Sequence, residues 1–172
     1  SNVLVPSASS SNYSLNYVTG SLTVVDDYQM IINAGSKSIS YGVVNTVNAS
    51  YLGNALSTTD GVVAGYCTNC ASGVGTRNII NLAITAPVVG SNVWLAEDSL
   101  GTGFNQGKYQ FVIAPSTSST DFVAGGSLKV GSYAMTPASL STVAGYTTRY
   151  ALNKPVIYES GVLSVTPKVL TI

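Results

Sequence analysis

The sequence predicts an all-β protein, an antiparallel β-sandwich of the immunoglobulin-like or jelly-roll kind. Many short segments alternate apolar and polar residues, and turn residues separate them. No stretch carries the longer apolar period of a helix. With 172 residues, the chain is long enough for one domain with a sizeable core. We therefore expect a single sandwich domain over residues 20–172, preceded by an N-terminal extension strand and linker over residues 1–19.

The expected strands are short and follow one another closely. In chain order they are residues 21–26, 28–33, 39–43, 61–66, 78–85, 93–96, 108–114, 122–123, 128–130, 146–152, 156–158 and 162–172. Residues 45–60 are left open between a helical turn and a loop, and residues 137–145 are ambiguous. In the last strand, Leu163, Val165 and Val169 share one face, and Pro167 predicts a sheet edge or a bulge because proline cannot donate to a ladder.

The first 19 residues combine an apolar start, a serine-rich run and a strand-like end. Val3 and Val5 precede Pro6 and residues 7–11, after which Tyr13, Leu15 and Tyr17 alternate with polar residues. A strand of this kind is a pairing hazard in a solitary monomer. We therefore expect this strand to pair with another subunit. Its alternate side chains, which we call the donor-strand set, would then enter pockets of that subunit: Val3, Val5, Tyr13, Leu15 and Tyr17.

Charge is the strongest compositional signal. Charged residues make up 8% of the chain, and seven acidic residues balance seven basic ones. Soluble domains carry about 25% charged residues. Nothing in this balance provides the basic field that holds a nucleic-acid backbone, so nucleic acid is not expected as a partner. No apolar run approaches the roughly twenty residues of a membrane span.

The setting indicated by the sequence is extracellular. The polar residues are mainly hydroxyls and amides, and we expect a mature, secreted chain because no signal peptide pattern opens the sequence. Two sequons, at Asn12 and Asn48, are compatible with N-glycosylation. Serine-rich and threonine-rich β proteins are also common outside cells, so composition alone does not distinguish a specialised role from an ordinary secreted domain.

The residues offer little for catalysis. Histidine is absent, which removes the commonest general base and metal ligand. A pair of carboxylates can hydrolyse glycosidic bonds, but the seven acidic residues are better explained as loop and strand-end groups. We expect no enzyme activity and no cofactor. The pairs Asp26-Asp27 and Glu97-Asp98 could bind calcium, although neither has a calcium-loop spacing and solvated turn carboxylates are the simpler explanation.

Cys67 and Cys70 are the only cysteines. A structural zinc needs four ligands, and a redox CxxC motif normally opens a helix, whereas glycines flank this pair. Residues i and i+3 of a tight turn are close enough for a disulfide. We expect a disulfide that locks a loop, consistent with an oxidising compartment.

Aromatic residues allow a second kind of function. The chain has eleven tyrosines and one tryptophan, and Tyr51, Tyr66, Trp94 and Tyr146 are candidates for a sugar-stacking platform. Tyrosine is also a favoured strand residue, so scattered structural tyrosines explain the same composition. The sequence leaves both interpretations open.

The layout resembles secreted β-sandwich filament proteins: archaeal thread subunits, TasA-like bundling pilins and, more distantly, chaperone-usher pilins. The resemblance covers the general plan of the chain, and only residues 3–18 match a family feature, the N-terminal strand. It implies insertion of that strand into the next subunit, head-to-tail self-association into a cell-surface filament, and glycosylation, which is frequent in the archaeal members. The position of the cysteines departs from the chaperone-usher pattern.

Two other functions fit the same features. A virion surface or capsid protein with a jelly roll would also be neutral and self-associating, although an inner shell needs a basic arm. A carbohydrate-binding or adhesin module would bind glycans through exposed aromatic residues and fold its own N-terminal strand back into its sheet. Of these functions, the sequence favours that of a structural subunit of an extracellular filament.

Overall fold

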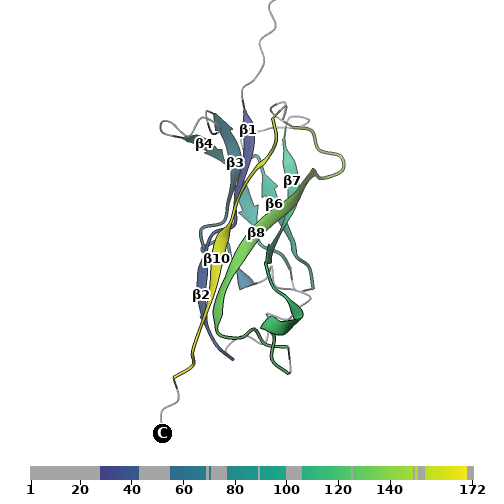
Figure 1. Cartoon of the computed structure of the whole chain (residues 1–172). Helices are drawn as coiled ribbons and strands as arrows, with labels where there is room; N and C mark the ends of the chain where they lie inside the picture. Colours follow the sequence, from purple (N-terminus) through teal and green to yellow (C-terminus); the bar gives the residue numbers. More distant parts are fainter. Residues whose placement is uncertain are drawn as a thin grey trace, which may run out of the picture.

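The fold is all-β, as predicted. The computed structural model describes residues 28–42, 55–68, 70, 77–88, 90–99, 106–124, 126–148, 150 and 154–169. Within these ranges the chain forms ten strands in two sheets and a single-turn 3₁₀ helix, η4 (Ser119–Asp121) (Figure 1). The two sheets face each other across one core, which is the predicted β-sandwich.

The larger sheet has six strands in the order β2-β10-β8-β7-β6-β5. Their bounds are β2 (Lys37–Ser40), β5 (Ala83–Thr85), β6 (Val93–Glu97), β7 (Lys108–Pro115), β8 (Gly131–Thr142) and β10 (Gly161–Thr166). The strands alternate buried and exposed residues, most regularly in β7, where Tyr109, Phe111 and Ile113 face the core as predicted. This alternation is the signature of a sheet with one wet face.

The smaller sheet has four strands in the order β4-β3-β1-β9. Their bounds are β1 (Gln29–Asn33), β3 (Val63–Thr68), β4 (Asn78–Asn81) and β9 (Ile157–Glu159). This sheet covers only the upper half of the molecule in Figure 1, whereas the six-stranded sheet extends through both halves. We use "upper half" for the part that holds the four-stranded sheet and "lower half" for the part below it.

Three segments of the chain pass from one sheet to the other. Residues 29–40 form β1 and then β2, residues 78–85 form β4 and then β5, and residues 157–166 form β9 and then β10. Such sheet-switching strands make the corners of a sandwich. They also correct two expectations. Residues 78–85 were expected to form one strand, but they form two strands that belong to different sheets. The sheets were expected to be antiparallel, but both are mixed, because β1 pairs with β9 and β2 pairs with β10 in parallel.

Two glycines permit the crossing at which the first and last of these segments change sheets. A Cβ on Gly161 would overlap the carbonyl group of Gly35, and Gly35 itself has a φ of 68°. A side chain at Gly35 would also meet the carbonyl of Asp60. The two backbones therefore touch at the middle of the molecule, and only residues without side chains allow this approach.

The core is continuous through both halves. Its largest fully buried side chains include Trp94, Tyr66, Tyr109 and Phe111, and the Trp94 and Phe111 rings stack at a centroid distance of 6.3 Å. Tyr66 and Tyr109 come from opposite sheets, and their hydroxyls form a hydrogen bond of 2.7 Å. Because of this bond, each buried hydroxyl has a hydrogen-bond partner, which avoids the free-energy cost of burying an unpaired polar group.

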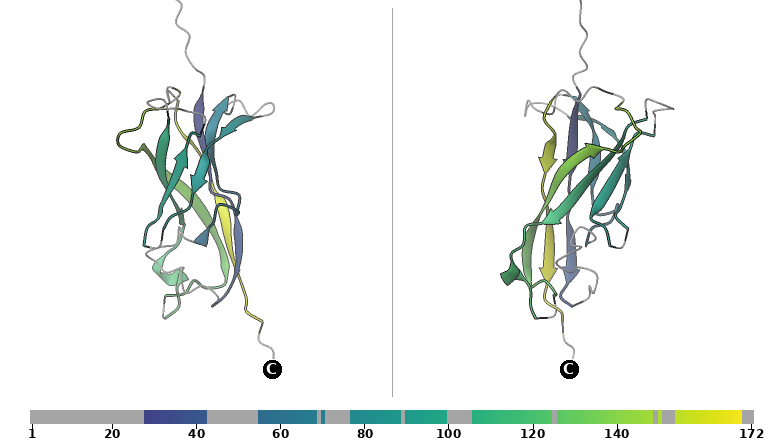
Figure 2. Two further views of the ribbon diagram at one scale, coloured as in Figure 1. Left: turned by 180° about the vertical axis from the view of Figure 1, so that it is seen from behind. Right: turned by 90° about the vertical axis from the view of Figure 1, so that its right-hand side faces the viewer.

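The molecule is elongated and has two poles (Figures 1 and 2). The described chain begins just before β1 at the upper pole, and the segment that follows β10 leads to the lower pole. The parallel pairing of residues 29–40 with residues 157–166 explains this arrangement, because both segments run from the upper to the lower half.

The structure corrects several expectations about the second half of the chain. The ambiguous residues 137–145 belong largely to β8, in which Pro137 is buried. Proline is tolerated there because β10 pairs with β8 only as far as Met135. Residues 146–148 form no strand, and of residues 122–130 only a single bridge joins Phe122 and Leu128.

The C-terminal strand also differs from the expectation. β10 lies between β2 and β8 and is therefore internal, not an edge. Leu163 and Val165 are buried as predicted, but Val169 is 87% exposed. Pro167 directly follows the strand, so it ends the ladder without forming an edge or a bulge.

Candidate functional site

Several carboxylates of the described residues make structural contacts, and Glu97 is one of them. Glu97 accepts a hydrogen bond of 2.6 Å from Gln106 and lies 3.6 Å from the ammonium of Lys108. Asp98 is buried, and its backbone N–H donates to the carbonyl of Gly107 at 2.8 Å. No group of three or more histidine, cysteine or acidic side chains that could hold a metal is found in the described part of the chain. Asp26 and Asp27, the other calcium candidates, lie outside it.

Two carboxylates fasten loops to the sheets. Burial raises the pKa of Asp60, but hydrogen bonds from Ser57 and the neighbouring ammonium of Lys37, 3.0 Å away, outweigh burial and lower the pKa. Glu159 accepts a hydrogen bond from Arg77, which lowers its pKa against the opposing effect of burial, and it also accepts a bond of 3.1 Å from Asn33. These two carboxylates therefore make stabilising contacts between distant parts of the chain.

Cys67 and Cys70 are placed as a disulfide pair. Their Cα atoms are 5.9 Å apart, within the range that the bond requires. Cys67 is the last residue but one of β3, and both cysteines are buried against Ile31. Ile79 and Ile157 pack beside them, so the pair belongs to a second apolar cluster on the outer face of the four-stranded sheet.

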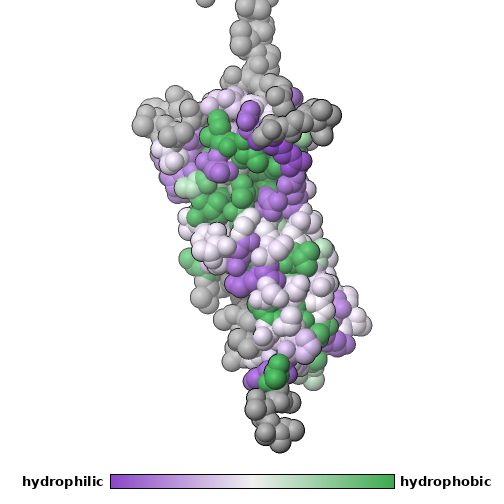
Figure 3. Space-filling model, turned by 90° about the vertical axis from the view of Figure 1, so that its left-hand side faces the viewer, coloured by the Kyte–Doolittle hydropathy of each residue, from purple (hydrophilic) through white to green (hydrophobic). Residues whose placement is uncertain are grey.

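Apolar surface marks that face of the molecule. Figure 3 looks onto the side on which the four-stranded sheet lies in Figure 1, and it shows apolar atoms gathered in the upper half between polar ones. The cluster of Ile31, Ile79, Ile157 and the two cysteines lies on this face. The sequence contained its signal, since Ile31 and Cys67 occupy outward positions of strands whose inward positions are also apolar.

The proposed sugar-stacking residues are not brought together. Trp94 and Tyr66 are fully buried in the core, so their ring faces are not available to a sugar. Tyr146 is 38% exposed, and its ring lies beneath the ammonium of Lys108, 5.2 Å from the ring centroid. Tyr51 lies outside the described residues.

A tyrosine cluster holds the start of the described chain at the upper pole. The Tyr28 ring stacks on Tyr150 at a centroid distance of 3.8 Å and meets the Tyr66 ring edge-on at 6.4 Å. The side chain of Gln29 donates to the carbonyl of Pro155 beside it. A ring pair of this kind contributes about 1 kcal/mol to stability, in addition to the contribution of the apolar area that it buries. The point at which the preceding 27 residues join the sandwich is therefore fixed.

The sequence-predicted donor strand itself lies outside the described residues. This holds for Val3, Val5, Tyr13, Leu15 and Tyr17, and for the two sequon asparagines, Asn12 and Asn48. The structure shows where the N-terminal segment joins the sandwich, at Tyr28, and which described strands lie at the sheet edges.

The lower half contains a sheet edge of four residues, formed by β2. β2 ends the six-stranded sheet, and its only strand neighbour among the described residues is β10. The N–H of Tyr41 donates to the carbonyl of Thr166 at 2.8 Å, so the odd-numbered residues of this segment direct their backbone groups toward β10. By alternation, Ser38 and Ser40 direct their N–H and C=O groups to the open side.

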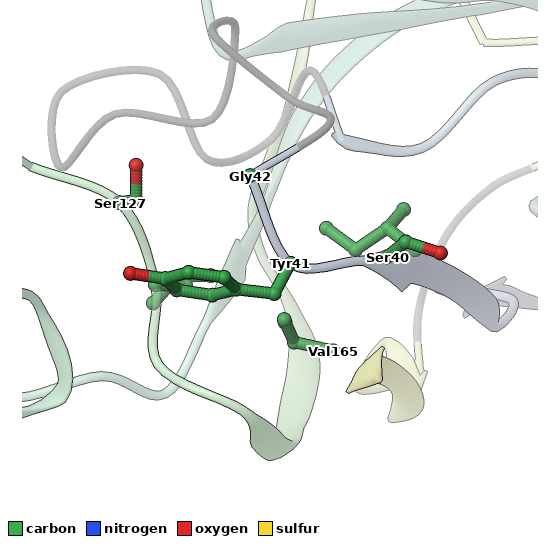
Figure 4. A pocket seen from close by; sticks show the side chains of 7 residues that line it. Ser40, Tyr41, Gly42, Ser127 and Val165 are labelled. Carbon is green, nitrogen blue, oxygen red and sulfur yellow. The ribbon is translucent and has the colours of Figure 1, made fainter. Parts of the chain in front are cut away.

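A small depression lies at the end of this edge. Ile39, Tyr41, Leu128 and Val165 line it together with Ser40, Gly42 and Ser127. Figure 4 shows the Tyr41 ring reaching from β2 toward the segment that carries Ser127, with Val165 beneath the ring. Its volume of about 10 Å³ holds one water molecule, so the depression suits the tip of a side chain and not an organic substrate.

Comparisons with family models, with curated proteins and with solved structures each returned no match. The function is therefore argued from the molecule itself. Within the described ranges, no helix is long and apolar enough to cross a membrane.

Proposed function

We propose that this chain is a structural subunit of an extracellular filament, in which the N-terminal strand of one molecule inserts into the sandwich of the next. The observation that carries the proposal is the polarity of the sandwich. β1, to which the N-terminal segment is attached, begins toward one pole, and β2, an edge strand of the six-stranded sheet among the described residues, lies toward the other. A contact between opposite ends of a molecule does not close on itself and therefore produces a fibre.

The composition supports the same function. A filament subunit buries much of its surface against neighbours, so it needs fewer charges to remain soluble than a free monomer does. The chain is neutral, with 8% charged residues. The carboxylates described above make structural contacts. The candidate sugar-stacking residues are divided between core and surface. Neither group therefore supports a different function better than the filament.

The assembly is tested by altering the strand without altering the sandwich. We expect deletion of residues 1–19, or the substitution Leu15→Asp, to abolish filaments in electron micrographs and to give a monomer in size-exclusion chromatography. A charge at an inward position of an inserted strand is buried without a partner, which costs several kcal/mol. Asn16→Asp is the matched control, because residue 16 lies on the opposite face of the same strand, and it should assemble.

The proposal is wrong if the full-length protein is a stable monomer, or if filaments persist after the deletion. Intact-mass measurement adds an independent observation. Glycan attached at Asn12 or Asn48 would support an extracellular location, and it would be lost on substitution of either asparagine by glutamine.

A further inference from the structure

The turn before β3 contains the only Asp-Gly dipeptide of the chain, Asp60-Gly61, and the chain has no Asn-Gly dipeptide. Aspartate followed by glycine is prone to spontaneous isomerisation, because glycine has no Cβ that hinders attack by its backbone nitrogen. Gly61 is exposed, and the side chain of Asp60 is 17% exposed, so water reaches both residues. The dipeptide therefore meets the sequence requirement of a covalent modification of the backbone.

The reaction has two steps and consumes only water. The backbone nitrogen of Gly61 attacks Cγ of Asp60 and loses its proton, while the carboxyl group loses its OH, so that one water leaves and a succinimide ring forms. A second water then opens the ring. Cleavage of the bond between the nitrogen and the α-carbonyl carbon leaves the main chain running through Cγ. The product is isoaspartate, which has the same mass as aspartate.

Three hydrogen bonds hold one carboxylate oxygen of Asp60 in place. This Oδ2 atom accepts from the backbone N–H of Ser57 at 2.6 Å, from the hydroxyl of Ser57 at 2.7 Å and from the ammonium of Lys37 at 3.0 Å. The backbone is also fixed, because the carbonyl of Asp60 accepts from the N–H of Ser36 at 2.9 Å. The first step requires Cγ to turn toward the nitrogen of Gly61, and the bonds to Ser57 and Lys37 resist this rotation.

The same contacts keep the carboxyl group ionised. Burial by itself would raise the pKa of Asp60, but the hydrogen bonds from Ser57 and the ammonium of Lys37 lower it. The first step releases a carboxyl oxygen as water, which requires a protonated carboxyl group, so an ionised carboxylate reacts slowly. Ser57 and Lys37 therefore oppose the reaction through position and through charge.

A second turn of the chain has the same construction without the glycine. Residues 57–60 read Ser-Thr-Thr-Asp, and residues 118–121 read Ser-Ser-Thr-Asp. In the second turn, Oδ2 of Asp121 accepts from the backbone N–H of Ser118 at 2.7 Å and from its hydroxyl at 3.0 Å. Phe122 follows this aspartate, and its side chain hinders attack by its own nitrogen. The second turn is therefore an internal control for the first.

We propose that Asp60-Gly61 is the site at which the folded chain forms isoaspartate, and that Ser57 and Lys37 are positioning residues that slow the reaction. The modification would act on the crossing between the sheets. The carbonyl oxygen of Asp60 lies 2.3 Å from the place that a Cβ on Gly35 would occupy, and isoaspartate adds one carbon to the main chain at this contact. The inference does not depend on the proposed filament function.

The test follows isoaspartate at residue 60 in the full-length folded protein at neutral pH, by peptide mapping with electron-transfer dissociation. We expect the wild type to form it more slowly than an unfolded synthetic peptide of residues 55–66. Ser57→Ala/Lys37→Met should form it about tenfold faster than the wild type, because charge-assisted hydrogen bonds to the carboxylate are lost. The conservative variant Ser57→Thr/Lys37→Arg keeps these donors and should remain close to the wild type.

Two controls separate a local effect from unfolding. Ser118→Ala/Lys129→Met removes the equivalent contacts of Asp121 and should not change the rate at residue 60. Asp98 is buried in the folded protein and is followed by the small residue Ser99, so isomerisation there reports unfolding.

The assignment is wrong if the wild type isomerises at residue 60 as fast as the peptide, or if Ser57→Ala/Lys37→Met is no faster than the wild type. An equal rise at Asp98 in that variant would also contradict a local role of the two residues. The modified protein, separated by chromatography, should unfold at a lower urea concentration than the unmodified protein. Equal midpoints would contradict the effect on the contact with Gly35.

Discussion

The upper and lower halves of this molecule are built differently. In the upper half two sheets face each other, and the core between them contains the hydrogen-bonded tyrosines Tyr66 and Tyr109. Among the described residues of the lower half, no second sheet faces the six-stranded sheet, and Ile39 on its edge strand β2 is only half-buried. Within the described residues, the upper half therefore has two facing sheets and the lower half has one.

This difference separates stability from assembly. Substitutions in the upper half remove contacts that the isolated subunit already has, so they should lower its free energy of unfolding. Substitutions in the N-terminal strand, such as Leu15→Asp, would remove only contacts that the proposed filament makes between subunits, so they should leave the isolated subunit almost unchanged. The predictions below test this separation, from the largest expected effect to the smallest.

The crossing between the halves should be the most sensitive position. Gly161→Ala places a methyl group against the carbonyl of Gly35, and neither backbone can move without shifting a strand. We expect a loss of about 3 kcal/mol or more in the free energy of unfolding, measured by urea denaturation. Gly131→Ala is the control, because its Cβ would meet only the Tyr133 side chain at 3.4 Å. Equal stability of the two variants would contradict the crossing described above.

The disulfide should stabilise the upper half moderately. For a loop of four residues the chain-entropy model gives about 2 kcal/mol, and the cysteines are three positions apart. We expect Cys67→Ala/Cys70→Ala to lose about that amount in urea denaturation while still forming filaments. In the native wild-type protein a thiol reagent should not react, and rapid labelling of either cysteine would show that the pair is not oxidised.

The tyrosine pair should show coupling across the two sheets. Tyr66→Phe and Tyr109→Phe each remove one hydroxyl of the 2.7 Å hydrogen bond and leave the other buried. We expect a loss of about 1–2 kcal/mol for each variant and less than the sum for the double variant. Additive losses in a double-mutant cycle would mean that the two hydroxyls do not depend on each other.

Acid should weaken the subunit slightly. The pKa values of Asp60 and Glu159 are lowered in the folded protein from ordinary values of 3.8 and 4.5. Their stabilisation is therefore complete above the unfolded pKa values and is lost as the pH falls through the folded ones. We expect about 0.5 kcal/mol from each group to disappear below pH ~4, because both ion pairs are partly solvated. Asp60→Asn and Glu159→Gln should flatten this dependence in thermal melts at pH 3–7.

Much of the fold was predictable from local patterns. Alternation of apolar residues correctly placed the strands around Met30, Tyr109 and Leu163, because a strand with one wet face requires a period of two. The pairing of the cysteines followed from their spacing. The order of the strands in the two sheets was not predictable, because a strand's own sequence does not say which neighbours it will have.

The sequence by itself determined the all-β class, the scarcity of charge and the presence of an N-terminal segment suited to pairing. Only the tertiary structure decided which of the described strands lie at the sheet edges. Residues 78–85 look like one strand and residues 162–172 look like an edge, yet the first segment divides between two sheets and the second is covered by β2. Both outcomes depend on where distant segments change sheets, and that is fixed by a contact between Gly35 and Gly161 that no local pattern records.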